Sequence, residues 1–204
     1  MCYALQVDLA MFQGQYDQAR VYIEQLRAIG QKTGKKAFLV YMHWSQAYLA
    51  RVQGNTQQAR QHAQECLKIA QEASNPNWIL EAINELGQIA LQQDDLELAG
   101  TLLRECLPIV HNMHNLVRFP YVIMGLAGLA SRLQANERVA RLFGVLDHYC
   151  RGLAYALAPI ERTQFEADQE AARAALGEAR FRQSFEAGRE MSVEQALAYA
   201  EKSD

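Results

Sequence analysis

Hydrophobic residues recur along this chain with the spacing of a buried helical face. Apolar positions separated by four and then three residues fall on one side of an α-helix. Three segments carry this stripe: Ala19, Ile23, Leu26 and Ile29; Ala59, Ala63, Cys66 and Ile69; and Ala99, Leu103, Cys106 and Ile109. The alternation of apolar and polar residues that is typical of strands is absent. The pattern predicts an all-α chain.

Each stripe follows a turn with a recurring residue pattern. The predicted turn residues are Gly14, Gly54, Asp94 and Ala135, which recur with a period of about 40 residues. Each is preceded by a glutamine and followed five residues later by an alanine: Gln13, Gln53, Gln93 and Gln134, and Ala19, Ala59, Ala99 and Ala140. Such a period predicts an α-α superhelix, a right-handed solenoid in which helical hairpins stack on one another.

The predicted domains are four hairpin repeats over residues 1–152 and a helical cap over residues 153–204. The first repeat has a short first helix, which suggests a segment of a longer solenoid. The fourth is predicted to be degenerate, because Gly144, Asp147 and Cys150 interrupt its stripe. In the cap, a helix is expected from Pro159 to Gly177 and a second up to Gly188. The Ser-x-x-Gln capping box at Ser192 begins a last one.

Three helix-end signals lie inside the repeats. Asn55 is predicted to cap a helix that begins at Thr56, because its side chain can accept a hydrogen bond from the first turn. Asn75 followed by Pro76 is a good start for the next helix. Pro108 lies within a predicted helix and should kink it.

Composition and charge exclude several classes of function. The 204 residues carry a net charge of −3, and their basic residues are scattered, whereas nucleic-acid binding needs a clustered basic face. No apolar run reaches the roughly 20 residues that span a membrane, and the N-terminal residues do not resemble a secretory signal. We expect a cytoplasmic protein whose cysteines are reduced. They are Cys2, Cys66, Cys106 and Cys150.

The repeat resembles the tetratricopeptide repeat. The likeness rests on the small residues Ala47, Gly87 and Gly128, on the turn at Gly54-Asn55, and on the alanine that follows. The longer period is similar to that of the superhelical repeats in the C-terminal half of MalT-type and LuxR-type (STAND-class) bacterial regulators. The tail is similar to the segment that closes this region in many of them. Its matching residues are Ala158, Pro159, Glu161, Arg162, Phe165, Glu166, Ala175, Leu176, Gly177, Phe181, Gly188, Met191, Ser192, Glu194 and Ala196.

The resemblance implies a sensing role. In those regulators the repeats sense an inducer or a partner protein, and a nucleotide-binding domain and a helix-turn-helix do the rest. This sequence contains neither a G-x-x-x-x-G-K-[ST] loop nor a basic recognition helix. The predicted function is therefore a non-catalytic interaction or inducer-sensing domain, the C-terminal portion of a larger transcriptional regulator. A free-standing adaptor and a regulatory appendage of a signalling enzyme are the alternatives.

The candidate binding surface lies on the first helices of the repeats. Tyr41, Trp44 and Tyr48 share one helical face, and Tyr, Trp and Arg are enriched where binding energy concentrates. The further candidates are Arg51, Glu81, Asn84, Gln88 and Arg132, the last placed in line with Arg51. The expected ligand is a protein, a peptide or a small-molecule inducer in a concave groove. The alternative is that Trp44 only fills space between repeats. The N-terminal edge is a candidate for self-association.

Catalytic and metal-binding signals are weak. Ser131 lies in GLASRL, which is not a nucleophile elbow. His62 with Cys66 and His111 with His114 share helical faces, but a structural zinc site needs four ligands. Cys66 also coincides with the buried stripe, which favours a core position. We expect no catalytic residue, cofactor or metal ion.

Overall fold

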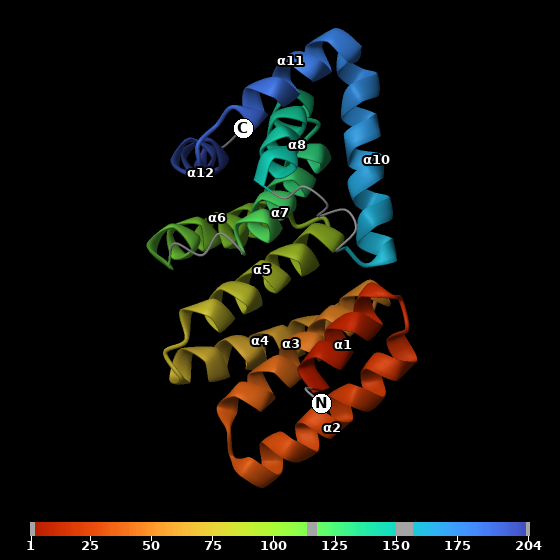
Figure 1. Ribbon diagram of the computed structural model, residues 1–204, viewed down its shortest axis with the longest axis vertical. Helices are drawn as coiled ribbons and strands as arrows, with labels where there is room; N and C mark the ends of the chain where they lie inside the picture. The colour runs from red at the N-terminus through yellow and green to blue at the C-terminus, as the bar shows by residue number, and fades with distance from the viewer. Residues whose placement is uncertain (1–2, 114–117, 150–156, 203–204) are drawn as a thin grey trace. The chain divides into compact units, whose positions relative to one another are not determined.

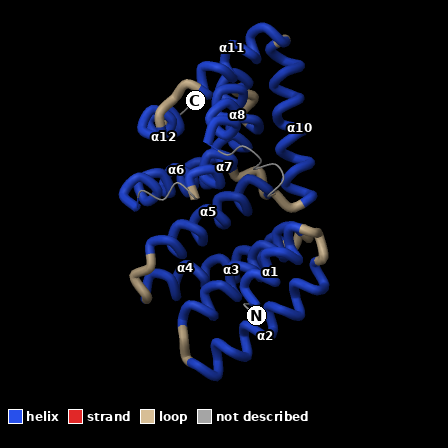
Figure 2. The backbone as a smooth tube through the Cα atoms, in the orientation of Figure 1, coloured by secondary structure: helices blue, strands red, loops and turns tan. Residues whose placement is uncertain are grey.

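The computed structural model describes residues 3–113, 118–149 and 157–202, and these contain helices and no strand (Figure 2). The prediction of an all-α chain of hairpin repeats is confirmed. Contacts between Cα atoms divide the chain into two compact units, residues 1–93 and residues 94–204, which are described separately below. Cys2, His114 and Cys150 lie outside the described residues.

The described part of the first unit consists of helices that pack in chain order (Figure 1). They are α1 (Tyr3–Phe12), α2 (Tyr16–Thr33), α3 (Lys36–Val52), α4 (Thr56–Glu72) and α5 (Pro76–Gln92). Helices α1 and α2 form one hairpin, and α3 and α4 form the next. Helix α3 packs against α2 and also touches α1, and α5 packs in the same way against α4 and α3. Each new first helix therefore lies on the hairpin before it.

Small residues allow this close packing. Ala47 and Ala50 of α3 meet Ala59 and Ala63 of α4, and Ile89 of α5 packs into the same cluster. A second cluster joins Val40, Cys66 and Ala82, with Trp44 and Trp78 packed against it. Its other partly buried members are Leu67 and Ile69. The apolar stripe predicted from the sequence thus forms the core of the unit.

Two of the three helix-end predictions meet a direct test. Asn75 is the N-cap of α5, where its side chain accepts a hydrogen bond from the backbone N–H of Trp78 at 3.3 Å, and Pro76 is the first helical residue. Asn55 precedes α4 as expected, but its side chain makes no capping bond, so that part of the prediction is wrong. Its backbone N–H instead donates to the carbonyl of Ala50 at 2.8 Å and closes the turn. Helix α6 continues through Pro108.

The turn after the first helix of each repeat places one residue in the left-handed region. These residues are Gly14, Gly54, Asp94 and Gln134, with φ between 58° and 79°. The predicted fourth turn residue, Ala135, is therefore one position too late. Hydrogen bonds agree: the Ala135 N–H donates to Ala130, just as the Asn55 N–H donates to Ala50. With this correction, the same interval separates each turn residue from the next.

This correction changes the interpretation of the fourth repeat. Counted from Gln134, the stripe is Val139, Phe143, Leu146 and Tyr149, of which the first three are buried. The apolar face therefore continues, and Gly144 occupies the next position along, where the first repeat has Glu24. The apparent loss of the stripe came from the shift of one residue. The boundary predicted at residue 152 remains a prediction.

The second unit contains the remaining described helices (Figure 1). They are α6 (Leu96–Met113), α7 (Phe119–Arg132), α8 (Asn136–Tyr149), α10 (Pro159–Leu176), α11 (Glu178–Arg189) and α12 (Val193–Glu201). Helix α7 packs against α6 and α8. Helices α10 and α11 pack against α8, and α12 contacts α6 and α8. The capping box at Ser192 is confirmed, whereas α11 runs through Gly188 and ends one residue later than predicted.

Helices α8 and α11 approach each other at two glycines. A Cβ atom on Gly144 would lie 1.9 Å from the Phe185 carbonyl oxygen, and one on Gly188 would lie 1.9 Å from the carbonyl oxygen of Arg141. Each glycine thus faces the backbone of the other helix. The two helices can approach this closely only because glycine has no Cβ atom at these positions. Gly144 is therefore part of the surface of α8 on which α11 packs.

Within the described segments, no helix combines the length and the apolar character that a membrane crossing requires.

Candidate interaction surface

The predicted aromatic residues of α3 form a connected group of rings. The ring centroids of Tyr41 and Trp44 are 5.8 Å apart, and those of Trp44 and Tyr48 are 6.0 Å apart. Trp78, from the start of α5, joins them at 5.6 Å from Tyr41, edge to face. Trp44 also packs against the buried cluster of Val40, Cys66 and Ala82. These aromatic side chains therefore link two repeats, and Trp44 contributes to the core.

Polar contacts fix both ends of this group. The Tyr41 hydroxyl donates to the Asp8 carboxylate and lies 2.9 Å from the Ala4 carbonyl oxygen, which ties α3 to α1. At the other end, the Arg51 guanidinium carbon lies 5.1 Å from the centroid of the Tyr48 ring, within the range of a cation–π contact. The aromatic face is therefore held in place on both sides.

Arg51 forms an ion pair with the next repeat. Its Nε donates to the Glu85 carboxylate at 2.6 Å, and the two side chains are only 12% and 5% exposed. Because both charges are largely desolvated, removing either one would leave an uncompensated buried charge. Arg51 thus has a structural role in addition to any contact with a ligand.

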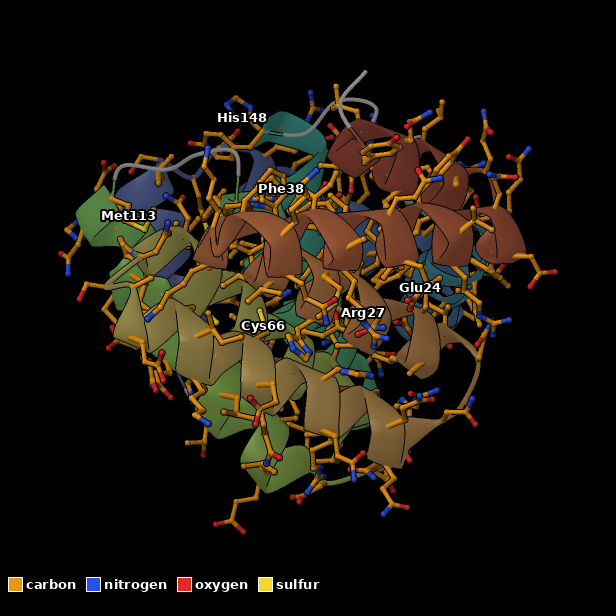
Figure 3. All side chains as sticks on the ribbon, turned by 90° about the horizontal axis from the view of Figure 1, so that it is seen from below. Glu24, Arg27, Phe38, Cys66, Met113 and His148 are labelled. Carbon is orange, nitrogen blue, oxygen red and sulfur yellow. The ribbon has the colours of Figure 1, made fainter. Side chains whose placement is uncertain are left out.

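The other predicted residues of α5 lie beside this pair. Glu81 is buried, whereas Asn84 and Gln88 are half-buried. The Asn84 Oδ1 atom is buried and has no hydrogen-bond partner among the described residues. Burial, together with the negative charges of Glu81 and Glu85, raises the pKa of the Cys66 thiol to about 12. The thiol sulfur of Cys66 therefore stays protonated inside the packed helices (Figure 3).

Arg132 differs from the other candidates in two respects. It belongs to the second unit, where its Nη1 lies 3.6 Å from the Asp94 carboxylate, and both side chains are exposed. Counted from the turn at Gln134, it corresponds to Val52, so the alignment with Arg51 is wrong. The residue equivalent to Arg51 is Ser131, whose hydroxyl lies 2.8 Å from a carboxylate oxygen of Asp168. The other predicted residues of the surface all lie in the first unit.

Sequence reasoning missed three residues of this surface. Trp78 occupies the place in its repeat that Phe38 occupies one repeat earlier, so the period marks it as an equivalent aromatic position. Asp8 and Glu85 carry no such signal, because an isolated acidic residue on a helix is ordinarily solvated. Only the packing of α3 between α1 and α5 shows that they bind Tyr41 and Arg51.

A cavity of about 420 Å³ lies in the first unit, between α2 and the hairpin of α3 and α4. Its lining includes Ile23, Leu49, Gln46, Arg20 and Glu24, and none of the residues predicted for the binding surface. The Gln46 Oε1 atom is buried, and the part of the chain that the structure describes offers it no hydrogen-bond partner. The cavity and the aromatic surface are therefore separate features.

His62 also lines this cavity, and its ring faces that of His43. The two Nδ1 atoms are 3.1 Å apart, so one ring donates a hydrogen bond to the other. Burial lowers the pKa of both imidazoles, and the Arg27 guanidinium lowers both further. In the candidate metal pair, His62 is thus engaged with His43 rather than with the buried Cys66. Among the described residues, no three His, Cys, Asp or Glu side chains gather to hold a metal ion.

Comparison with known proteins supports one class of repeat for part of the chain. The model of the tetratricopeptide repeat family matches residues 38–110. No curated protein and no solved structure matches the chain. The matched residues run from α3 into α6 and include Tyr41, Trp44, Tyr48 and Arg51. It supports a tetratricopeptide-like repeat domain, a kind of fold that is generally non-catalytic and serves as a scaffold for protein interaction.

Proposed function

We propose that this chain binds a protein or peptide partner at the face formed by Tyr41 and Trp44 with Asn84 and Gln88 of the next repeat, while the largely buried Tyr48, Arg51 and Glu81 hold that face in place. The observation that carries the proposal is the fixed aromatic face that ends in the pair of Arg51 and Glu85, inside the segment that matches the tetratricopeptide repeat. Aromatic and arginine side chains in a preformed arrangement bind with little loss of conformational freedom.

The larger assignment is that this chain is the sensing portion of a bacterial transcriptional regulator of the MalT or LuxR type. Its support is the resemblance of the repeats and of the tail from Ala158 to Ala196. A full-length coding sequence that joins this segment to a nucleotide-binding domain and a helix-turn-helix would support it. A kinase or cyclase domain in their place would indicate an enzyme appendage. A coding sequence with none of these domains would indicate an adaptor.

Site-specific crosslinking tests the binding surface. A photoreactive amino acid replaces Gln88, which is half-buried on α5, or Gln71, which is exposed on α4 and serves as the control. We expect a covalent partner adduct at residue 88 and not at residue 71. Gln88→Lys should then weaken that partner's binding by about tenfold, or roughly 1.4 kcal/mol, while Gln71→Lys leaves it unchanged. Equal adducts at the two positions, or equal affinities of the two lysine variants, would contradict the proposal.

The cavity beside Gln46 favours a second candidate function, the binding of a small-molecule inducer. Its volume lies within the range of about 300–1,000 Å³ that is common for ligand pockets, and the unpaired Gln46 carbonyl can accept a hydrogen bond from a ligand. In the next repeat the equivalent residue is Leu86, which packs against the alanine cluster. A ligand that raises the melting temperature of the wild-type chain should therefore fail to stabilise Gln46→Leu.

A further inference from the structure

Helix α1 exposes large apolar side chains on the side away from the rest of its unit. Leu5 is 68% exposed and Leu9 is 57% exposed, whereas Val7, Ala10 and Met11 on the other side of the helix are buried. Phe12 continues the exposed row, one turn after Leu9. A surface helix normally presents polar residues to water, so this row has the composition of a packing face.

The later repeats show what covers this position. Leu9 lies five residues before the turn residue Gly14, and its equivalents are Leu49, Ile89 and Leu129. Those three are 4%, 0% and 4% exposed. The equivalents of Leu5 in the second and third repeats, Ser45 and Glu85, are buried as well. The part of this face formed by Leu5 and Leu9, which is open in α1, is thus closed in the repeats that follow.

In the first unit, the cover is the hairpin that precedes each first helix. Ile89 of α5 sits against Ala47, Ala50, Ala59 and Ala63, the small residues of the α3–α4 hairpin. Leu49 of α3 faces α2, where Ile23 lines the same cavity. The connection is short in both cases, because α3 begins at Lys36 after α2 ends at Thr33, and α5 begins at Pro76 after α4 ends at Glu72.

We propose that the Leu5–Leu9 face of α1 is a repeat-to-repeat interface, and that its partner is a helical hairpin of the same repeat type that precedes α1 in the polypeptide. The inference rests on the proposal that the chain is a portion of a larger protein. The required partner has small residues where the α3–α4 hairpin has Ala47, Ala59 and Ala63. A large apolar side chain such as Leu9 then fits between its helices, as Ile89 does.

A second copy of this chain is a poorer fit to the face. The last hairpin, α7 and α8, is covered in its own unit by α10 and α11, with α11 seated on Gly144. Stacking this hairpin on the α1 of another copy would require α11 to leave. A contact between two α1 helices would bring together three large side chains from each copy, far less than the roughly 800 Å² per partner of a stable interface.

An extended chain tests the proposal. A copy of residues 36–82 is placed directly before Tyr3. Its residues 36–72 add one hairpin, and its residues 76–82, which begin α5, extend α1 at the N-terminal end in the same register. Leu9→Glu is introduced into both the 204-residue chain and the extended chain. We expect its melting temperature to change by no more than about 1 °C in the former, and to fall by roughly 5–10 °C in the latter, because a carboxylate is then buried.

Val21→Glu is the matched control. Val21 is 51% exposed in the same unit, but its equivalents Gln61 and Thr101 are also exposed, so it should be neutral in both chains. Without any substitution, amide hydrogen exchange in α1 should be at least about tenfold slower in the extended chain.

Three results would overturn the proposal. They are a neutral Leu9→Glu in the extended chain, unchanged exchange in α1, and a dimer of the 204-residue chain that Leu9→Glu dissociates, which would make a second copy the occupant. These readouts are stability, exchange and mass, so they are independent of partner capture at Gln88.

Discussion

At the scale of single residues, the pair of His43 and His62 makes the stability of the α3–α4 hairpin depend on pH. Their Nδ1 atoms share a hydrogen bond at 3.1 Å, which requires at least one neutral ring. Charged groups reach the pair from two helices: Arg27 of α2 opposes its protonation, and Glu65 of α4 favours protonation of His43. Glu24 of α2 forms an ion pair with Arg27 at 3.3 Å, and both are labelled in Figure 3.

Acidification should therefore destabilise the chain before its carboxylates titrate. The folded-state pKa of each histidine lies below the ordinary 6.5, so the unfolded chain binds more protons as pH falls through that value. The melting temperature should fall between about pH 7 and pH 5. His62→Gln should reduce this fall, and His148→Gln, at an exposed position, should not. A fall that is the same in wild type and in His62→Gln would contradict the assignment.

Residues of the buried stripe could be predicted individually, because burial of a helical face depends only on spacing. Ala59, Ala63 and Cys66 are completely or almost completely buried, as expected. The polar side chains that pair between helices could not be predicted, since their pairing depends on which helices become neighbours. Asp8 and Tyr41 belong to different hairpins, and so do Arg51 and Glu85. A pairing of this kind becomes visible only when the repeats are stacked.

At the scale of helices, the two asparagine caps of the first unit differ in a testable way. Asn75 accepts a hydrogen bond from the Trp78 backbone, whereas Asn55 makes no side-chain cap. Asn75→Ala should therefore lower the free energy of unfolding by about 1 kcal/mol, and Asn55→Ala should cost clearly less. Urea unfolding of the two variants under identical conditions provides the measurement. Equal losses would show that the capping bond of Asn75 contributes nothing.

The helix boundaries followed from the sequence except at the fourth turn and at the end of α11. Most predicted helices agree with the structure to within a few residues, because glycine, asparagine and proline mark their ends. The fourth turn was misplaced because Gln134 adopts the left-handed conformation that glycine favours, and glutamine gives no sign of it. Because the predicted turn was one residue too late, Arg132 was aligned with Arg51, and the apolar stripe of the fourth repeat was predicted to be degenerate.

At the scale of the whole molecule, the structure has two compact units, and the tail helices complete the second one. The sequence predicted a helical tail after the repeats. It could not predict how the tail attaches, because Gly144 and Gly188 are far apart along the chain and either one alone is an ordinary helix glycine. Their reciprocal contact explains why α11 lies on α8.

Adding a methyl group at this contact should loosen the second unit alone. Gly144→Ala should lower its stability by about 1–3 kcal/mol, because the new Cβ would overlap the Phe185 carbonyl. Gly100→Ala is the control, since its closest neighbour is the flexible end of Arg104. Hydrogen exchange should accelerate in α8, α10 and α11 and remain unchanged in α1–α5. An equal effect of the two substitutions would contradict the close packing of α11 on α8 at Gly144.

The links between hairpins have a consequence for how such a chain changes over generations. Gly34 and Ser74 occupy the same place in successive repeats, each in the left-handed conformation and each directly before the residue that caps the next helix. Recombination between the two codons would delete one hairpin and join Gly34 to Asn75 and Pro76. No residue at the junction would enter a foreign backbone conformation. The backbone at this junction therefore does not by itself oppose the gain or loss of a whole hairpin.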